Sequence, residues 1–223
     1  MDQADEANLP QRCACWQITL LPFGFTPDEA SFGYDAYSIL KTGRDQWGHL
    51  LPLTLESFGD FKLPLYSYLT IPSVAIFGLN VFATRLPNAI IGTLAVLATY
   101  LMVREFLKIE NLKNSEAKLK TSSMEIENKN PTSLWKLKIL APALRAISPW
   151  HIMMSRGAFE ANLTTLLMPL SVYYFLKFVN SRVSSYMLLA SITFGLNLFS
   201  YHSARLVTPL IIASLIFFFR NEL

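Results

Sequence analysis

Charged side chains are scarce in this sequence of 223 residues. Asp, Glu, Lys and Arg together make up 16% of it, whereas soluble domains contain about 25%. The deficit is concentrated after Leu63, where Leu86–Val103 is a run of 18 residues without a charge and Val183–Tyr201 is a run of 19. Since a helix needs roughly 20 mostly apolar residues to cross the bilayer core, the sequence predicts an all-α, multi-pass integral membrane protein.

Several functional motifs are also absent. The net charge of +3 is small, and no Lys/Arg cluster is interleaved with stacking aromatic residues, so nucleic acid is not an expected partner. The sequence has no phosphate-binding P-loop, no GxGxxG and no HExxH. Its two cysteines, Cys13 and Cys15, are too close for either a disulfide or a zinc knuckle. No cofactor is predicted with certainty, and a divalent metal stays an open alternative.

Four regions follow one another along the chain. Residues 1–62 form a polar, aromatic-rich head, residues 63–104 are apolar, and residues 105–136 are charged and expected to be flexible or weakly helical. Residues 137–223 contain apolar runs expected to form about four transmembrane helices. Because the last run, Leu206–Phe219, has only 14 residues and no signal or span precedes the head, we expect a fragment of a longer protein.

The charged region predicts an orientation. Eight Lys and Arg residues lie between residues 104 and 138, and the positive-inside rule places such a loop in the cytoplasm. With Leu137–Ser155 as the next span, Arg156 and Glu160 are expected outside, and so are His202 and Arg205 two spans later.

The segment Leu63–Thr84 allows two topologies. As a full span it would leave the head in the cytoplasm, and as an interfacial or re-entrant segment it would leave the head outside. Pro64, Pro72 and Gly78 interrupt helical hydrogen bonding, which favours the second topology. That topology also places six polar residues on one side of the membrane: Asp28, Lys62, Arg156, Glu160, His202 and Arg205.

The head and the membrane entry carry the first candidates for chemistry. Asp28 and Glu29 follow Pro27 at an expected helix start, where carboxylates either favour the helix dipole or supply a general base. Lys62 either extends its ammonium to the lipid headgroups or binds a phosphate.

The remaining candidates lie between the apolar runs. Arg156 and Glu160 are four residues apart and suited to pairing on a helix. His202 and Arg205 lie in one short break, where they either anchor the chain at the interface or hold a phosphate. Arg145, inside a predicted span, must either reach the cytoplasmic interface, which we expect, or face the interior of the bundle.

Five motifs occur in an order that resembles the GT-C membrane glycosyltransferases. The closest group is glycosyltransferase family 39 with its bacterial relatives, which include protein O-mannosyltransferases and the aminoarabinose transferases of lipid A. The motifs are TPDEASFGYDAYSILKTGRD from residue 26, ESFGDFKLPLY from 56, FGLNVFATRLPNA from 77, ISPWHIMMSRGAFEAN from 147 and YHSAR from 201. The resemblance covers most of residues 26–210, with Lys-Leu-Pro where the family has Lys-Pro-Pro.

The resemblance implies a fold and a reaction. The fold would be a multi-span helical bundle whose external loop bears short juxtamembrane helices, in a bacterial plasma membrane with the active face extracytoplasmic. The reaction would move a sugar, with inversion, from a polyprenyl-phosphate donor to a hydroxyl-bearing acceptor. Two alternatives stay open, a non-catalytic remnant that binds lipid phosphate and a transporter or flippase.

The resemblance also implies roles for individual residues. Asp28 would be the catalytic base with Glu29 beside it, and Lys62 would bind the donor phosphate. His202 and Arg205 would be further phosphate-side groups, and Arg156 and Glu160 would support them.

Overall fold

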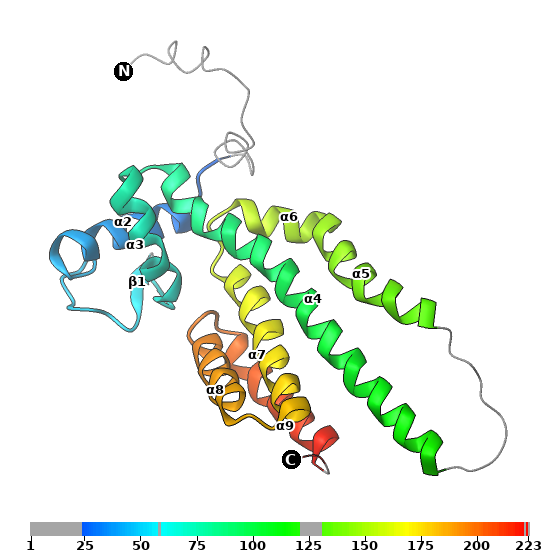
Figure 1. Cartoon of the computed structure of the whole chain (residues 1–223). Coiled ribbons are helices and arrows are strands. Elements are labelled where there is room, and N and C mark those ends of the chain that lie inside the picture. Colours follow the sequence, from blue (N-terminus) through cyan, green and yellow to red (C-terminus); the bar gives the residue numbers. More distant parts are fainter. Residues whose placement is uncertain (1–23, 58, 121–130, 221, 223) are drawn as a thin grey trace.

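A computed structural model describes residues 24–57, 59–120, 131–220 and 222. This part of the chain contains eight helices and one short hairpin (Figure 1). The head consists of α2 (Pro27–Thr42), the antiparallel strands β1 (Leu55–Ser57) and β2 (Asp60–Lys62), and α3 (Leu65–Phe77). The bundle consists of α4 (Val81–Lys120), α5 (Pro131–Ile147), α6 (Pro149–Arg156), α7 (Ala161–Ser181), α8 (Ser184–Leu198) and α9 (Ala204–Phe219). The predominance of helix confirms the predicted all-α class.

The start of α2 follows from four consecutive residues. Thr26 caps the helix, Pro27 occupies its first turn, and the Thr26 and Glu29 side chains each accept a hydrogen bond from the other residue's backbone amide. The helix ends at Gly43, whose φ of 70° suits glycine. This local chemistry fixes Asp28 in the exposed first turn.

One helical segment is long and apolar enough to cross a membrane within the described residues. It is Val81–Glu110, a stretch of 30 residues in the first part of α4. Only 33% of its most apolar window is buried inside the protein, whereas the core helix of a soluble protein is mostly buried. The exposed side chains include Ile90, Leu94 and Leu97, so this helix presents an apolar surface suited to lipid.

The segment before α4 is not one continuous helix. α3 has 13 residues, which gives a length of about 20 Å, less than the ≈30 Å of a bilayer core. It ends at Gly78, whose φ is 75°, and Asn80 then accepts a hydrogen bond from the Ala83 amide at the start of α4. α3 is therefore shorter than a full span, and the interfacial topology of Leu63–Thr84 stays a prediction.

Two sequence-based boundaries differ from the structure. The predicted span Leu137–Ser155 is divided between α5 and α6 at Ser148, because Pro149 lacks an amide and pushes Ser148 into an extended conformation. The first part of the charged region, residues 105–120, continues α4, because tertiary packing of Leu107 and Ile109 extends the helix beyond the apolar run.

Arg145 lies on the inner side of the bundle. Its Nη1 donates to Thr99 Oγ1 and its Nη2 to the Thr165 carbonyl, both at 2.6 Å. The expectation that it reaches the cytoplasmic interface is wrong, because acceptors on α4 and α7 satisfy the guanidinium within the protein.

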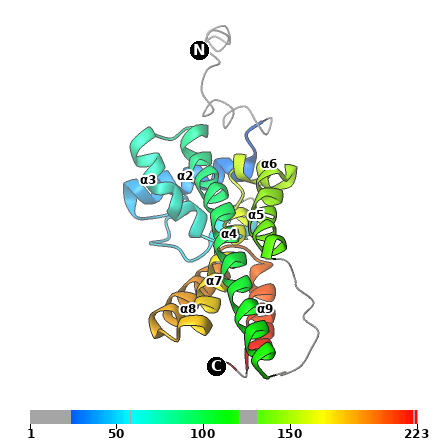
Figure 2. The ribbon, with the colours of Figure 1, turned by 45° about the vertical axis from the view of Figure 1, so that its right-hand side comes forward.

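The bundle core lies between α4, α7, α8 and α9. Its buried side chains include Ile109, Leu176, Phe194 and Phe219. The head packs against the first turns of α4, where a β-carbon at Gly33 would lie 2.7 Å from Thr84 Oγ1, so the close approach of α2 requires glycine. In both overall views the head lies at the end of the bundle where α4 begins and α6 ends (Figure 2).

Candidate functional site

An ion pair joins the head's helix to its hairpin. Lys62 Nζ lies 2.7 Å from Asp28 Oδ1. The Lys62 side chain is only 8% exposed, whereas the Asp28 side chain is 68% exposed. The ammonium also lies 4.8 Å from the centre of the Phe32 ring, a cation–π contact. The buried ammonium of Lys62 is thus paired with a carboxylate that is open to solvent.

Glu160 lies beside this pair at the start of α7. Burial raises its pKa to about 7, although the positive charges of His202 and Lys62 and a hydrogen bond from the Leu63 amide act in the opposite direction; Asp60 adds to the rise. Its Oε2 atom is buried without a hydrogen-bond partner. Near neutral pH this carboxyl is therefore able to exchange a proton.

The turn between α8 and α9 reaches the same place. His202 Nε2 lies 2.8 Å from the Phe61 carbonyl, so Nε2 carries the hydrogen and donates it. Arg205 follows three residues later and is exposed, and its side chain makes no hydrogen bond or ion pair with any residue that the structure describes. Residues separated by more than 170 positions, from Asp28 to Arg205, thus gather at one end of the bundle.

Glu29 points in a different direction from its neighbour. It is fully buried, and its carboxylate accepts from Arg85 Nε at 2.7 Å, Arg85 Nη2 at 2.8 Å and the Ala158 amide at 2.8 Å. Burial raises its pKa, but the hydrogen bonds from Arg85, Thr26 and Ala158 outweigh that effect, so its pKa lies below the usual value. Its oxygens are occupied by structural contacts, which gives it a positioning role beside Asp28.

Arg156 is the last residue of α6. It lines a cavity of about 720 Å³ between α4, α5 and α6. Its supporting role beside Glu160 stays a prediction.

Sequence reasoning missed two residues of this region, Arg85 and Asp35. Arg85 interrupts the apolar region 63–104, and a buried arginine usually has an acidic partner, so its isolation was an available signal. Asp35 is buried, and burial raises its pKa to about 6; the Gln46 amide, Ser31 and Lys62 oppose the rise, and the Asp45 charge adds to it. Asp35 follows Asp28 by seven residues, or about two helical turns, and this spacing indicates that the two residues lie on the same face of α2.

No group of three or more His, Cys, Asp or Glu side chains in the described segments is arranged to hold a metal ion. Cys13 and Cys15 lie outside those segments. No protein-family model, curated protein or solved structure matches this chain, so its function has to be inferred from the geometry above.

Proposed function

We propose that this chain belongs to a multi-pass membrane glycosyltransferase of the GT-C class. It would transfer a sugar from a polyprenyl-phosphate donor to a hydroxyl acceptor with inversion of configuration. The observation that carries the proposal is the open carboxylate of Asp28, 2.7 Å from the buried ammonium of Lys62. The reaction requires a base that takes the acceptor proton on one face of the sugar and a cation that binds the leaving phosphate on the opposite face, and Asp28 and Lys62 supply one group of each kind.

The reaction can be written with these residues. The acceptor oxygen attacks the anomeric carbon, its proton passes to Asp28, and the bond between the anomeric carbon and the phosphate oxygen breaks. The electron pair of that bond stays on the departing polyprenyl phosphate. Lys62 and Arg205 would stabilise the charge that develops there, and His202 fixes the strand that bears Lys62 through its bond to Phe61.

Membrane insertion beyond α4 is part of the same proposal. α8 and α9 expose large apolar side chains, among them Leu188, Ile192, Leu206 and Phe218. Exposed apolar surface of this extent suits a lipid environment. Because α4 runs from the site end of the bundle toward the basic residues after Val103, the positive-inside rule supports an extracytoplasmic site.

The position of the charged groups favours transfer over transport. Transporter sites lie near the bilayer midplane between repeats, whereas Lys62 and His202 act on the Glu160 carboxyl at the start of α7. A remnant that binds lipid phosphate without transferring sugar would keep Lys62 and would not need Asp28.

The test uses the chain reconstituted in liposomes with a panel of polyprenyl phosphates that carry different radiolabelled sugars. Asp28→Asn should lower sugar transfer at least 100-fold, since general-base catalysis contributes about 10²–10⁴-fold, while membrane insertion stays unchanged. The matched control is Glu110→Gln, which lies about 40 Å along α4 from Val81 and should leave transfer unaffected. Normal transfer by Asp28→Asn would remove the catalytic assignment, and donor binding without transfer would identify the remnant.

A further inference from the structure

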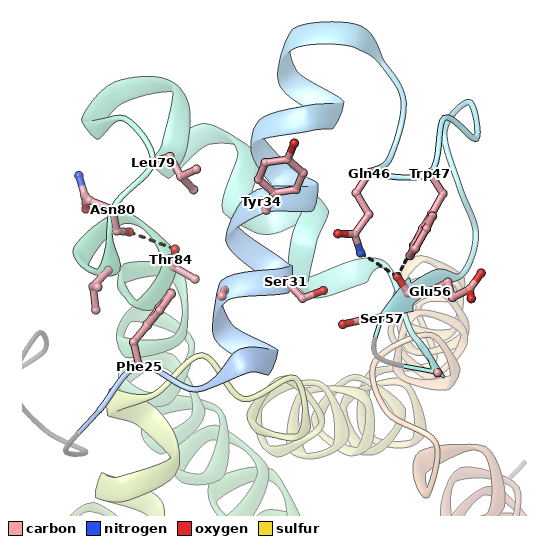
Figure 3. A pocket seen from close by; sticks show the side chains of 13 residues that line it. Phe25, Ser31, Tyr34, Gln46, Trp47, Glu56, Ser57, Leu79, Asn80 and Thr84 are labelled. Carbon is pink, nitrogen blue, oxygen red and sulfur yellow. Dashed lines mark hydrogen bonds between the residues drawn. The ribbon is translucent and has the colours of Figure 1, made fainter.

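A hollow of about 740 Å³ lies between α2, the loop that leads into the hairpin, and the turn between α3 and α4 (Figure 3). This volume is typical of small-molecule sites. Ser31 of α2 lines it, only three residues from Asp28, and such a spacing places the two β-carbons about 5–6 Å apart.

Aromatic rings form a large part of the wall and one of them is firmly held. Phe25, Tyr34 and Trp47 line the hollow. The Trp47 indole Nε1 donates to the Glu56 carbonyl at 2.8 Å, and the Trp47 amide donates to Asp45 Oδ1 at 2.9 Å. Trp47 as a whole residue is nevertheless 59% exposed, so an aromatic surface held in place by hydrogen bonds is available for contact.

A hydroxyl without a partner lies at the inner end of the hollow. Ser57 is 1% exposed and its Oγ makes no hydrogen bond. Ser31 Oγ donates to Asp35, which leaves its own lone pairs free. The two hydroxyl groups point toward one another in Figure 3. A buried hydroxyl without a partner is costly, and a bound ligand with its own hydroxyl groups would satisfy it.

The charges exclude an anionic ligand. The lining contains no Lys, Arg or His, and its one charged residue, Glu56, directs its carboxylate away from the other labelled side chains in Figure 3. A phosphate would therefore bind at Lys62 and not here.

The hairpin edge also disfavours an extended peptide. A peptide that added a strand to β1 would need the edge carbonyl of Glu56. That carbonyl already accepts from Gln46 Nε2 and Trp47 Nε1, both at 2.8 Å. The side chains that define the hollow thus block strand addition at this point.

We propose that the hollow between Trp47, Ser31 and Ser57 binds an uncharged sugar ring and is the acceptor site. An apolar ring face would lie on Trp47 while ring hydroxyls bond to Ser57 and Ser31. This inference rests on the proposed glycosyltransferase function and adds the substrate class, a neutral glycan in place of a protein segment or a phosphorylated sugar.

Binding is measured directly, without the donor. The full chain in detergent is titrated with a set of neutral methyl glycosides and disaccharides, and Trp emission is followed; Trp47→Phe identifies the part of the signal that comes from Trp47. At least one neutral sugar should bind saturably. Ser57→Ala should weaken that binding roughly 3- to 10-fold, as expected for one lost hydrogen bond.

Ser67→Ala is the matched control. Ser67 is also buried with an Oγ that lacks a hydrogen bond, but it does not line the hollow, so its replacement should leave sugar affinity unchanged. The inference is overturned if no neutral sugar binds, if Ser57→Ala binds as well as the original chain, or if a hexose 6-phosphate or a Ser/Thr-containing hexapeptide binds at Trp47 instead.

The binding assay and the transfer assay fail independently. Sugar binding that depends on Ser57, without any transfer from polyprenyl phosphates, would retain the site and remove the catalytic proposal. Transfer that depends on Asp28 but not on Ser57 would retain the catalysis and remove this acceptor site.

Discussion

Two carboxylates that are neighbours in the sequence occupy opposite environments. Asp28 is open to solvent and meets a single cation at the molecular surface, whereas Glu29 is buried and accepts from Arg85, Thr26 and Ala158. One residue along a helix rotates the side chain by about 100°, which directs Asp28 toward β2 and Glu29 toward α4. Two adjacent acids in one motif therefore differ in role. The exposed Asp28 is accessible to a substrate, and the buried Glu29 holds α2, α4 and the Ala158 backbone together.

Replacing Arg85, the cation of the buried ion pair with Glu29, should cause the largest loss of stability. Arg85→Met leaves the Glu29 carboxylate buried without its charge partner, so we expect the free energy of unfolding to fall by about 3–5 kcal/mol. Thermal unfolding in detergent measures the change. Lys41→Met, an exposed site on the same helix as Glu29, should change stability by less than about 0.5 kcal/mol.

The double variant Glu29→Gln/Arg85→Met sharpens that result. Once neither partner is charged, part of the lost stability should return, because the cost arises from an unpaired buried charge. Equal destabilisation in the single and double variants would show that Arg85 contributes by packing alone.

Replacing the carboxylate by the corresponding amide at Asp28 and at Glu29 compares the two residues directly. Glu29→Gln keeps an oxygen that accepts from Arg85 but loses the charge, so unfolding should become easier by about 1–3 kcal/mol. Asp28→Asn changes a side chain that is 68% exposed and keeps an oxygen that can accept from Lys62, so it should cost about 0–1 kcal/mol. Chemical denaturation of both variants measures the difference, and equal destabilisation would contradict the assignment of separate roles.

The start of α2 could be predicted from the sequence, whereas the contact between Glu29 and Arg85 could not. Thr26, Pro27 and Glu29 are a capping pattern that predicts the start of α2 within a few residues, so the placement of Asp28 in a first turn was readable. The partnership of Glu29 with Arg85 joins residues 56 positions apart, and local propensity contains no information about such a contact.

The same division applies to the bundle. Apolar runs predicted most of the helices, but the break at Ser148 depends on a single proline and the run-length pattern did not reveal it. The interior position of Arg145 depends on acceptors on two other helices, Thr99 and Thr165. The hollow beside Trp47 arises only when α2, the hairpin and the α3–α4 turn come together.

The pH dependence of Glu160 extends the comparison to a third carboxyl, which is less buried than Glu29 and more buried than Asp28. Its pKa in the folded state is raised to about 7 from 4.5. The folded protein therefore binds more protons than the unfolded chain between these values, and stability falls as pH rises from about 4.5 to about 7. Given its partial exposure, we expect a loss on the order of 1 kcal/mol.

Glu160→Gln should remove this part of the pH dependence, because an amide does not titrate. Since Lys62, His202 and Asp60 also face the carboxyl, the measurement is the difference between the unfolding profiles of the original chain and the variant from pH 4 to pH 8. Asp60→Asn removes a negative charge that raises the pKa of Glu160, so it should shift the midpoint of that difference to lower pH. A difference that stays flat across the range would mean that Glu160 titrates like an exposed carboxyl.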